Sequence, residues 1–109
     1  MGISKTEKFT ENQNQIAALA KVLGHPARIA ILEYLADRNS CVCGDIVDEL
    51  PLSQSTVSQH LKELKNVGLV KGTIEGPSMC YCIDAEVWAK AQTRIKNFFD
   101  EVDVHMNCC

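Results

Sequence analysis

The chain has 109 residues, of which 46% are apolar and 23% charged, and its net charge is −3. This length predicts one domain, residues 1–109, whose modest core a dimer would enlarge. The acidic balance is unusual for a nucleic-acid-binding protein, and no apolar run reaches the length of a signal peptide or a membrane span. We therefore expect a cytoplasmic protein with no membrane partner.

Six cysteines are present, and they fall into three close pairs. The pairs are Cys41 with Cys43, Cys80 with Cys82, and Cys108 with Cys109. Cytosolic thiols stay reduced, so these residues need a reason other than a disulfide framework.

The first predicted elements are two helices that follow a flexible arm at residues 1–10. Apolar residues recur at helical spacing in Ile16, Leu19, Ala20 and Leu23, and Gly24 then provides a stop. Pro26 suits the first turn of a second helix, which His25 caps. Residues 27–35 are apolar nearly all round, which predicts a central, buried helix.

Two short helices with a break between them follow a loop at residues 37–40. The first begins around Asp45, and its apolar residues are Ile46, Val47 and Leu50. Ser53 is a good N-cap for the second helix. Val57, Leu61 and Leu64 form its apolar stripe, and Gly68 ends it. This arrangement is typical of a helix-turn-helix.

A β-hairpin is predicted directly after these helices, with strands at residues 69–74 and 79–83 and a turn at 75–78. The second strand alternates, so Met79, Tyr81 and Ile83 share the core face. Cys80 and Cys82 then share the outer face. The fold class is therefore mostly α with a β-hairpin wing, a winged helix-turn-helix.

The last segment, residues 84–109, reads as a helix followed by a cysteine tail, with Asp84 as the cap. Its apolar positions are spaced three and four apart in a heptad seam, at Trp88, Ala91, Ile95, Phe98 and Val102. One interpretation is that this face covers the domain's own core. The length of the seam favours the other, in which the protein is a homodimer through its terminal helices.

Three segments resemble the ArsR/SmtB family of metal-sensing transcriptional repressors, in particular its arsenic-sensing branch. They are LGHPARIAILEYL, SQSTVSQHLKELKNVGLV and GPSMCYCI, and the similarity covers residues 15–83. The resemblance implies a homodimer that binds double-stranded operator DNA without metal and leaves it when metal binds.

The polar face of the second helix of the helix-turn-helix is the candidate DNA-reading surface. Its residues are Gln54, Ser55, Thr56, Ser58, Gln59, His60 and Lys62. Glutamine pairs with adenine edges, and serine or threonine reaches bases or phosphates. A merely solvated face would carry more Glu and Lys. Lys62, Lys65 and Lys71 would add attraction for phosphates.

Cys41 and Cys43 form the candidate metal site. Residues i and i+2 share one side of an extended segment but not of a helix, so both thiols face one ion only if this stretch is extended. The resemblance implies that a Cys-Val-Cys at this place binds arsenic or a heavy metal. The alternative is that both cysteines are small buried hydrophobes.

The ligand that would complete this site is left open by the sequence. Some arsenic sensors of the family carry a third cysteine where this chain has Ile46. One source is Cys108 or Cys109 of a partner subunit, and another is an external thiol. In a third alternative, Cys108 and Cys109 form a metal site of their own. Cys80 and Cys82 are either exposed chelating thiols or incidental ones.

These observations predict a non-enzymatic, metal-responsive repressor whose inducer is As(III) or Sb(III), with Cd(II), Pb(II) or another thiophilic ion as alternatives. A second hypothesis keeps the fold but makes the thiols sensors of oxidants or reactive sulfur. A third, a thiol oxidoreductase or metal carrier, is disfavoured because the chain has Cys-x-Cys without the βαβ unit that such chemistry uses.

Overall fold

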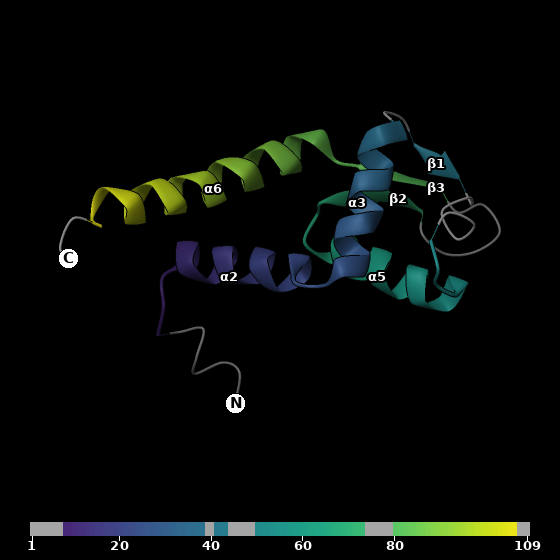
Figure 1. Ribbon diagram of the computed structural model, residues 1–109, viewed down its shortest axis with the longest axis horizontal. Helices are drawn as coiled ribbons and strands as arrows, with labels where there is room; N and C mark the ends of the chain where they lie inside the picture. Colours follow the sequence, from purple (N-terminus) through teal and green to yellow (C-terminus); the bar gives the residue numbers. More distant parts are fainter. Residues whose placement is uncertain (1–7, 39–40, 44–49, 74–79, 107–109) are drawn as a thin grey trace.

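The computed structural model describes residues 8–38, 41–43, 50–73 and 80–106, and the side chain of Cys43 lies outside that description. The described helices are α2 (Glu11–Leu23), α3 (Pro26–Arg38), α5 (Gln54–Asn66) and α6 (Ala85–Val104). The strands are β1 (Val42–Cys43), β2 (Val70–Thr73) and β3 (Cys80–Ile83). Figure 1 shows α3, α5 and the sheet gathered at one end, with α2 and α6 extending from it.

The helix ends agree with the sequence signals. Gly24 is the C-cap of α2, Pro26 opens α3, and the Nδ1 atom of His25 accepts a hydrogen bond from the Ala27 amide at 3.1 Å. The Ser53 hydroxyl accepts from the Thr56 amide, and Asp84 accepts from the first amides of α6. Each cap satisfies backbone groups that a helix end would otherwise leave unpaired.

The three strands form an antiparallel sheet in the order β1–β3–β2. The hairpin of β2 and β3 is the predicted wing, and its register pairs Gly72 with Tyr81 and Thr73 with Cys80. On the other side of β3, Val42 pairs with Tyr81 and Cys43 with Cys80. The stretch around Val42 is therefore extended, which is the condition that the two-thiol interpretation required.

The core lies between α3, α5 and the inner face of the sheet, with the end of α2 closing it. It consists of Leu19, Val22, Ile31, Leu32, Leu35, Val42, Val57, Leu61, Leu64, Leu69, Val70 and Tyr81. The predicted stripe of α5 is confirmed, because Val57, Leu61 and Leu64 are completely buried. The predicted central helix contributes Ile31, Leu32 and Leu35 to the core, but only this face of α3 is buried, and Ile29 is exposed.

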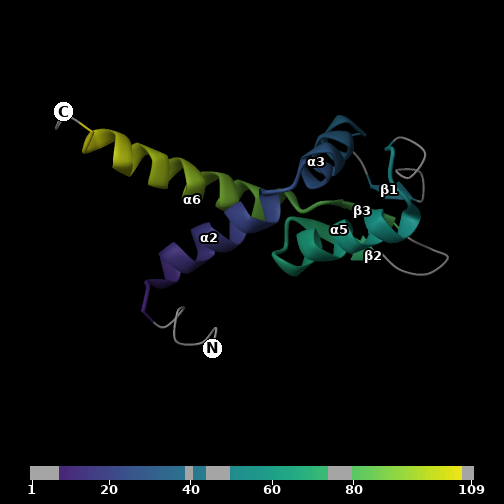
Figure 2. The same ribbon diagram turned by 60° about the horizontal axis from the view of Figure 1, so that its bottom comes forward.

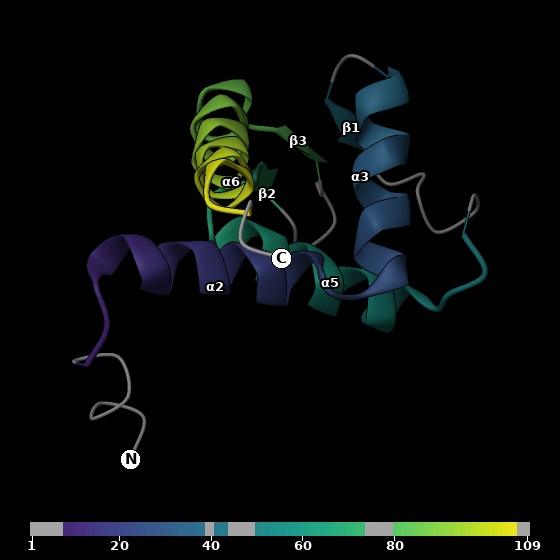
Figure 3. The same cartoon turned by 60° about the vertical axis from the view of Figure 1, so that its left-hand side comes forward.

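Helix α6 is long and exposed. None of its residues is buried, and Trp88, Phe98 and Val102 of the predicted seam are exposed, whereas Ala91 and Ile95 pack against the core. Figure 2 shows α6 and α2 diverging at an angle as they extend away from the sheet, and Figure 3 shows α6 nearly end-on above α2. A hydrogen bond of 2.6 Å from Arg94 Nη1 to Asn12 Oδ1 joins the two helices.

Several predicted features lie outside the described residues. They are the short helix around Asp45 with Ile46 and Val47, the turn at 75–78, most of the arm at 1–10, and the tail cysteines Cys108 and Cys109. Among the helices that the structure describes, none is long and apolar enough to cross a membrane.

Gly72 is the residue on which the wing register depends. Its φ is +118°, and a Cβ there would clash with the carbonyl oxygen of Cys80. We expect Gly72→Ala to lower the free energy of unfolding by at least about 1–3 kcal/mol, since both the backbone conformation and the close approach would be lost. Denaturant unfolding followed by circular dichroism measures this. Gly24→Ala is the matched control, because φ there is −82°, and a loss of equal size in both variants would contradict the argument.

Candidate DNA-binding face and cysteine site

Helix α5 presents a polar face opposite its buried stripe. Gln54, Ser55, Gln59 and Lys62 are exposed, and Thr56 and Ser58 are half-buried. The Gln59 amide donates to the Glu63 carboxylate at 3.3 Å, and the hydroxyls of Ser55 and Thr56 lie within hydrogen-bond distance of Ser53 Oγ. The face therefore offers short polar groups and amides at the helix N-terminus, where the helix dipole favours an anion.

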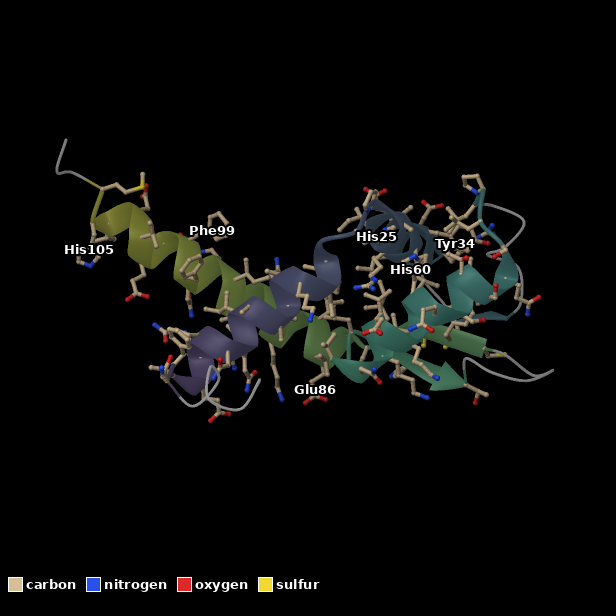
Figure 4. The ribbon with its side chains drawn as sticks, turned by 90° about the horizontal axis from the view of Figure 1, so that it is seen from below. His25, Tyr34, His60, Glu86, Phe99 and His105 are labelled. Carbon is tan, nitrogen blue, oxygen red and sulfur yellow. The ribbon has the colours of Figure 1, made fainter. Side chains whose placement is uncertain are left out.

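His60 does not belong to this face. Only 7% of the residue is exposed, and its Nδ1 atom accepts a hydrogen bond from Arg28 Nε at 3.1 Å. Its ring lies 4.4 Å from that of His25 between ring centres, and Figure 4 shows the two together. The prediction that His60 accompanies the DNA-reading residues is wrong, because the Arg28 contact holds the ring between α5 and α3.

The environment of His60 disfavours its charged form. Burial lowers the pKa of His60 below its ordinary value, the charges of His25 and Arg28 lower it further, and Glu63 opposes them. The neutral ring is also the form that accepts the hydrogen bond from Arg28.

The wing is attached to α5 by a lysine. The Nζ atom of Lys65 donates to the carbonyl oxygen of Gly72 at 2.6 Å. Lys71 is exposed on the same strand, β2. This contact ties β2 to the last turn of α5.

Two cysteine segments that are distant in the sequence meet in the sheet. Cys41 is exposed beside β1 and Cys82 is half-buried on β3. Their thiols are hydrogen-bonded to each other, which is the main cause that raises the pKa of Cys82, with burial a smaller cause. From the sequence, Cys41 with Cys43 and Cys80 with Cys82 are two separate predictions. The sequence feature that could have predicted their meeting is the shared Cys-x-Cys spacing, which places two side chains on one face of a strand.

Cys80 is disulfide-bonded in the structure, whereas the sequence predicted reduced thiols. Cys43 lies directly opposite Cys80 in the register. Such partners have Cα atoms about 4.5–5.5 Å apart, within the range that disulfides span. Among the residues described, no three His, Cys, Asp or Glu side chains are grouped so as to hold a metal ion. The side chains of Cys43, Cys108 and Cys109 lie outside the described part of the chain.

Residues 25–71 match the model of a family described as bacterial regulatory proteins of the arsR family. The chain is 42% identical over 79 residues to an uncharacterised HTH-type transcriptional regulator of Methanocaldococcus jannaschii, covering 71% of this chain and 88% of that protein. It is 32% identical over 96 residues to the HTH-type transcriptional regulator CmtR of Mycobacterium tuberculosis, covering 88% of this chain and 80% of the relative.

A solved structure is similar throughout. The crystal structure of Mycobacterium tuberculosis Rv0081 superposes with a TM-score of 0.60 and 29% sequence identity, covering 85% of this chain and 97% of the other. The helices and the hairpin thus have the winged helix-turn-helix arrangement that the sequence predicted.

The buried ring of His60 predicts a pH dependence of stability. Because the pKa is lower in the folded protein, the unfolded chain takes up the proton first. The stabilisation is complete above the unfolded pKa of about 6.5 and is lost as the pH falls through the folded pKa. We expect His60→Gln to lose less free energy of unfolding between about pH 7 and pH 5 than the wild type does. Urea unfolding at each pH tests this, with the exposed His105→Gln as control, and parallel pH profiles for wild type and His60→Gln would refute it.

Proposed function

This chain belongs to the arsR family of bacterial regulatory proteins, and from this we propose that it is a dimeric repressor released from its operator by a thiophilic ion. The observation that carries the proposal is the exposed polar face of α5, which Lys65 ties to the wing. The Cys-x-Cys segment lies at β1 of the same sheet. The relatives named above are transcriptional regulators, so the oxidoreductase alternative is set aside.

The proposed DNA-binding surface is the exposed polar face of α5. A recognition helix enters the major groove and reads base edges through residues near its N-terminus. Gln54, Ser55, Ser58 and Gln59 supply these contacts here, with Thr56 beside them. Lys62 and Lys71 attract phosphates, and Lys65 positions the wing through Gly72. These lysines supply positive charge at α5 and β2, although the net charge of the chain is −3.

The proposed dimer interface is formed by α6. Its exposed aromatic residues Trp88 and Phe99 border apolar hollows against α2 and α3. The radius of gyration is 16.2 Å, against about 13 Å for a compact domain of this length. A second copy packed on α6 and α2 would cover these side chains and place two recognition helices on an inverted-repeat operator.

The proposed inducer site consists of Cys41 and Cys43, which lie in an extended stretch at β1. Soft thiolates favour As(III) and Sb(III) as inducers, with Cd(II), Pb(II) or another thiophilic ion as alternatives. Cys108 and Cys109 are candidate further ligands. Helix α6 ends at the opposite end of the molecule from β1 (Figure 1), so such a ligand at β1 would come from the partner subunit.

Release follows from where the ion binds. The segment after β1 leads directly to Ser53 and α5, so an ion that reorders it shifts the recognition helix. A coupling free energy of about 1–3 kcal/mol lowers operator affinity roughly 5–150-fold.

A redox-sensing repressor of the same fold is the second candidate, and the disulfide at Cys80 favours it. In that case peroxide or persulfide would oxidise paired thiols and release DNA, whereas arsenite would have no effect.

The base-reading role of α5 is tested at Gln59. We expect Gln59→Ala to weaken binding to the protein's own promoter fragment by about 1–3 kcal/mol, because a bidentate contact with adenine would be lost. Fluorescence anisotropy at fixed salt measures this. Gln15→Ala is a matched control, since Gln15 also donates to a glutamate four residues away, but on α2. Equal affinities of the two variants would argue against the contact.

The inducer is tested by titrating arsenite, under reducing conditions, into the complex of protein and labelled promoter DNA. We expect release in the wild type and none in Cys41→Ser or Cys43→Ser, since each variant lacks a thiolate of the site. Tight binding that arsenite leaves unchanged, together with release by peroxide, would replace metal sensing with redox sensing.

A further inference from the structure

The two Cys-x-Cys segments are neighbouring antiparallel strands. Position 43 pairs with position 80, and position 42 with position 81. The same register brings position 41 opposite position 82, and the thiols of Cys41 and Cys82 are indeed hydrogen-bonded. Cys80 in turn is within bonding distance of another cysteine sulfur, because it is in a disulfide. One end of this short ladder therefore brings two thiols together, and at the other end Cys43 and Cys80 occupy paired positions.

The residues between the cysteines fix the face on which the thiols lie. Val42 and Tyr81 are buried in the core. Because side chains alternate along a strand, the neighbours of these two residues lie on the opposite face of the sheet. Cys41 is exposed and Cys80 and Cys82 are half-buried, so a solute reaches this face without opening the core.

We propose that β1 and the wing strand β3 together form one thiolate site for a thiophilic metal ion, in which Cys80 and Cys82 supply the ligands that Cys41 and Cys43 lack. This inference rests on the proposed function and identifies the missing ligands of its sensor. In the structure Cys80 is held in a disulfide, and the described side chains form no such metal-binding group. The site forms once that disulfide is reduced, and each thiol releases its proton to solvent as it binds the ion.

The dimensions of the ladder suit such a site. Opposed positions are about 5 Å apart and alternate positions along a strand about 7 Å apart. Thiolates that lean toward the centre of this rectangle converge on one ion, for which metal–sulfur distances are about 2.3 Å. Four sulfur ligands favour a soft divalent ion in tetrahedral geometry, whereas the two thiols of β1 alone would leave half of that coordination to solvent.

An ion in this position would join both DNA-binding elements. β1 precedes the segment that leads to α5, and β3 pairs with β2, whose Gly72 carbonyl accepts from Lys65 of α5. Binding would fix the wing and the approach to the recognition helix relative to each other. A ligand on the wing therefore gives the ion a direct effect on the DNA-binding surface.

The test is a titration of Cd(II) into the full-length protein, kept reduced with a phosphine and in the presence of a competing chelator. Thiolate-to-Cd(II) charge-transfer absorbance reports the number of sulfur ligands. We expect Cys80→Ser/Cys82→Ser to lose about half of the absorbance per ion and at least about tenfold in affinity, because two of the ligands are removed. Thr73→Ala, which replaces the exposed neighbour opposite Cys80 on β2, should bind as the wild type does.

Two results would overturn the proposal. One is unchanged absorbance and affinity in the double variant. The other is a loss of absorbance in Cys108→Ser/Cys109→Ser instead. Circular dichroism and promoter binding without metal establish that each variant is folded, and Cys82→Ser alone, with an expected loss of about one quarter, serves if the double variant is not. Arsenite release of promoter DNA by a double variant with unchanged Cd(II) binding would leave the proposed function standing and remove only this inference.

Discussion

The central strand β3 pairs with β1 on one side and β2 on the other, and the placement of the functional groups depends on this double pairing. Tyr81 in the middle of β3 is fully buried and opposes Val42 and Gly72. Its burial holds β3 on the core, because a slip of one residue would turn the ring to solvent and the cysteines inward. The wing, the alignment of the two Cys-x-Cys segments and the contact of Lys65 with Gly72 all follow from this register.

Local features of the fold could be predicted from the sequence, because each signal acts within a few residues. Ser53 and Asp84 cap helices through their own side chains, and the stripe of Val57, Leu61 and Leu64 follows helical periodicity. The pairing of β1 with β3 could not be predicted in this way. It joins residues about forty positions apart, and a strand of two residues carries no periodicity of its own.

His60 illustrates a second limit of sequence reasoning. Its position three residues after Val57 places it next to the buried stripe, but an imidazole is as compatible with a solvated face as with a core edge. The residue that determines the position of the ring is Arg28. Its guanidinium donates a hydrogen bond to His60 from α3, and the two residues are 32 positions apart in the sequence. Burial of a polar ring requires such a partner, and only the packing of α3 on α5 reveals it.

The acidic net charge and the DNA-binding fold are reconciled by the shape of the molecule. Asp100, Glu101 and Asp103 lie near the end of α6, and the molecule is 52 Å long. Figure 1 shows α5 at the other end. Charges separated by more than the Debye length of about 8–10 Å are largely screened at physiological salt. The phosphates of bound DNA would therefore respond to Lys62 and Lys71 nearby and very little to these acids. In such an elongated chain, the local charge of each end predicts its binding partner better than the total does.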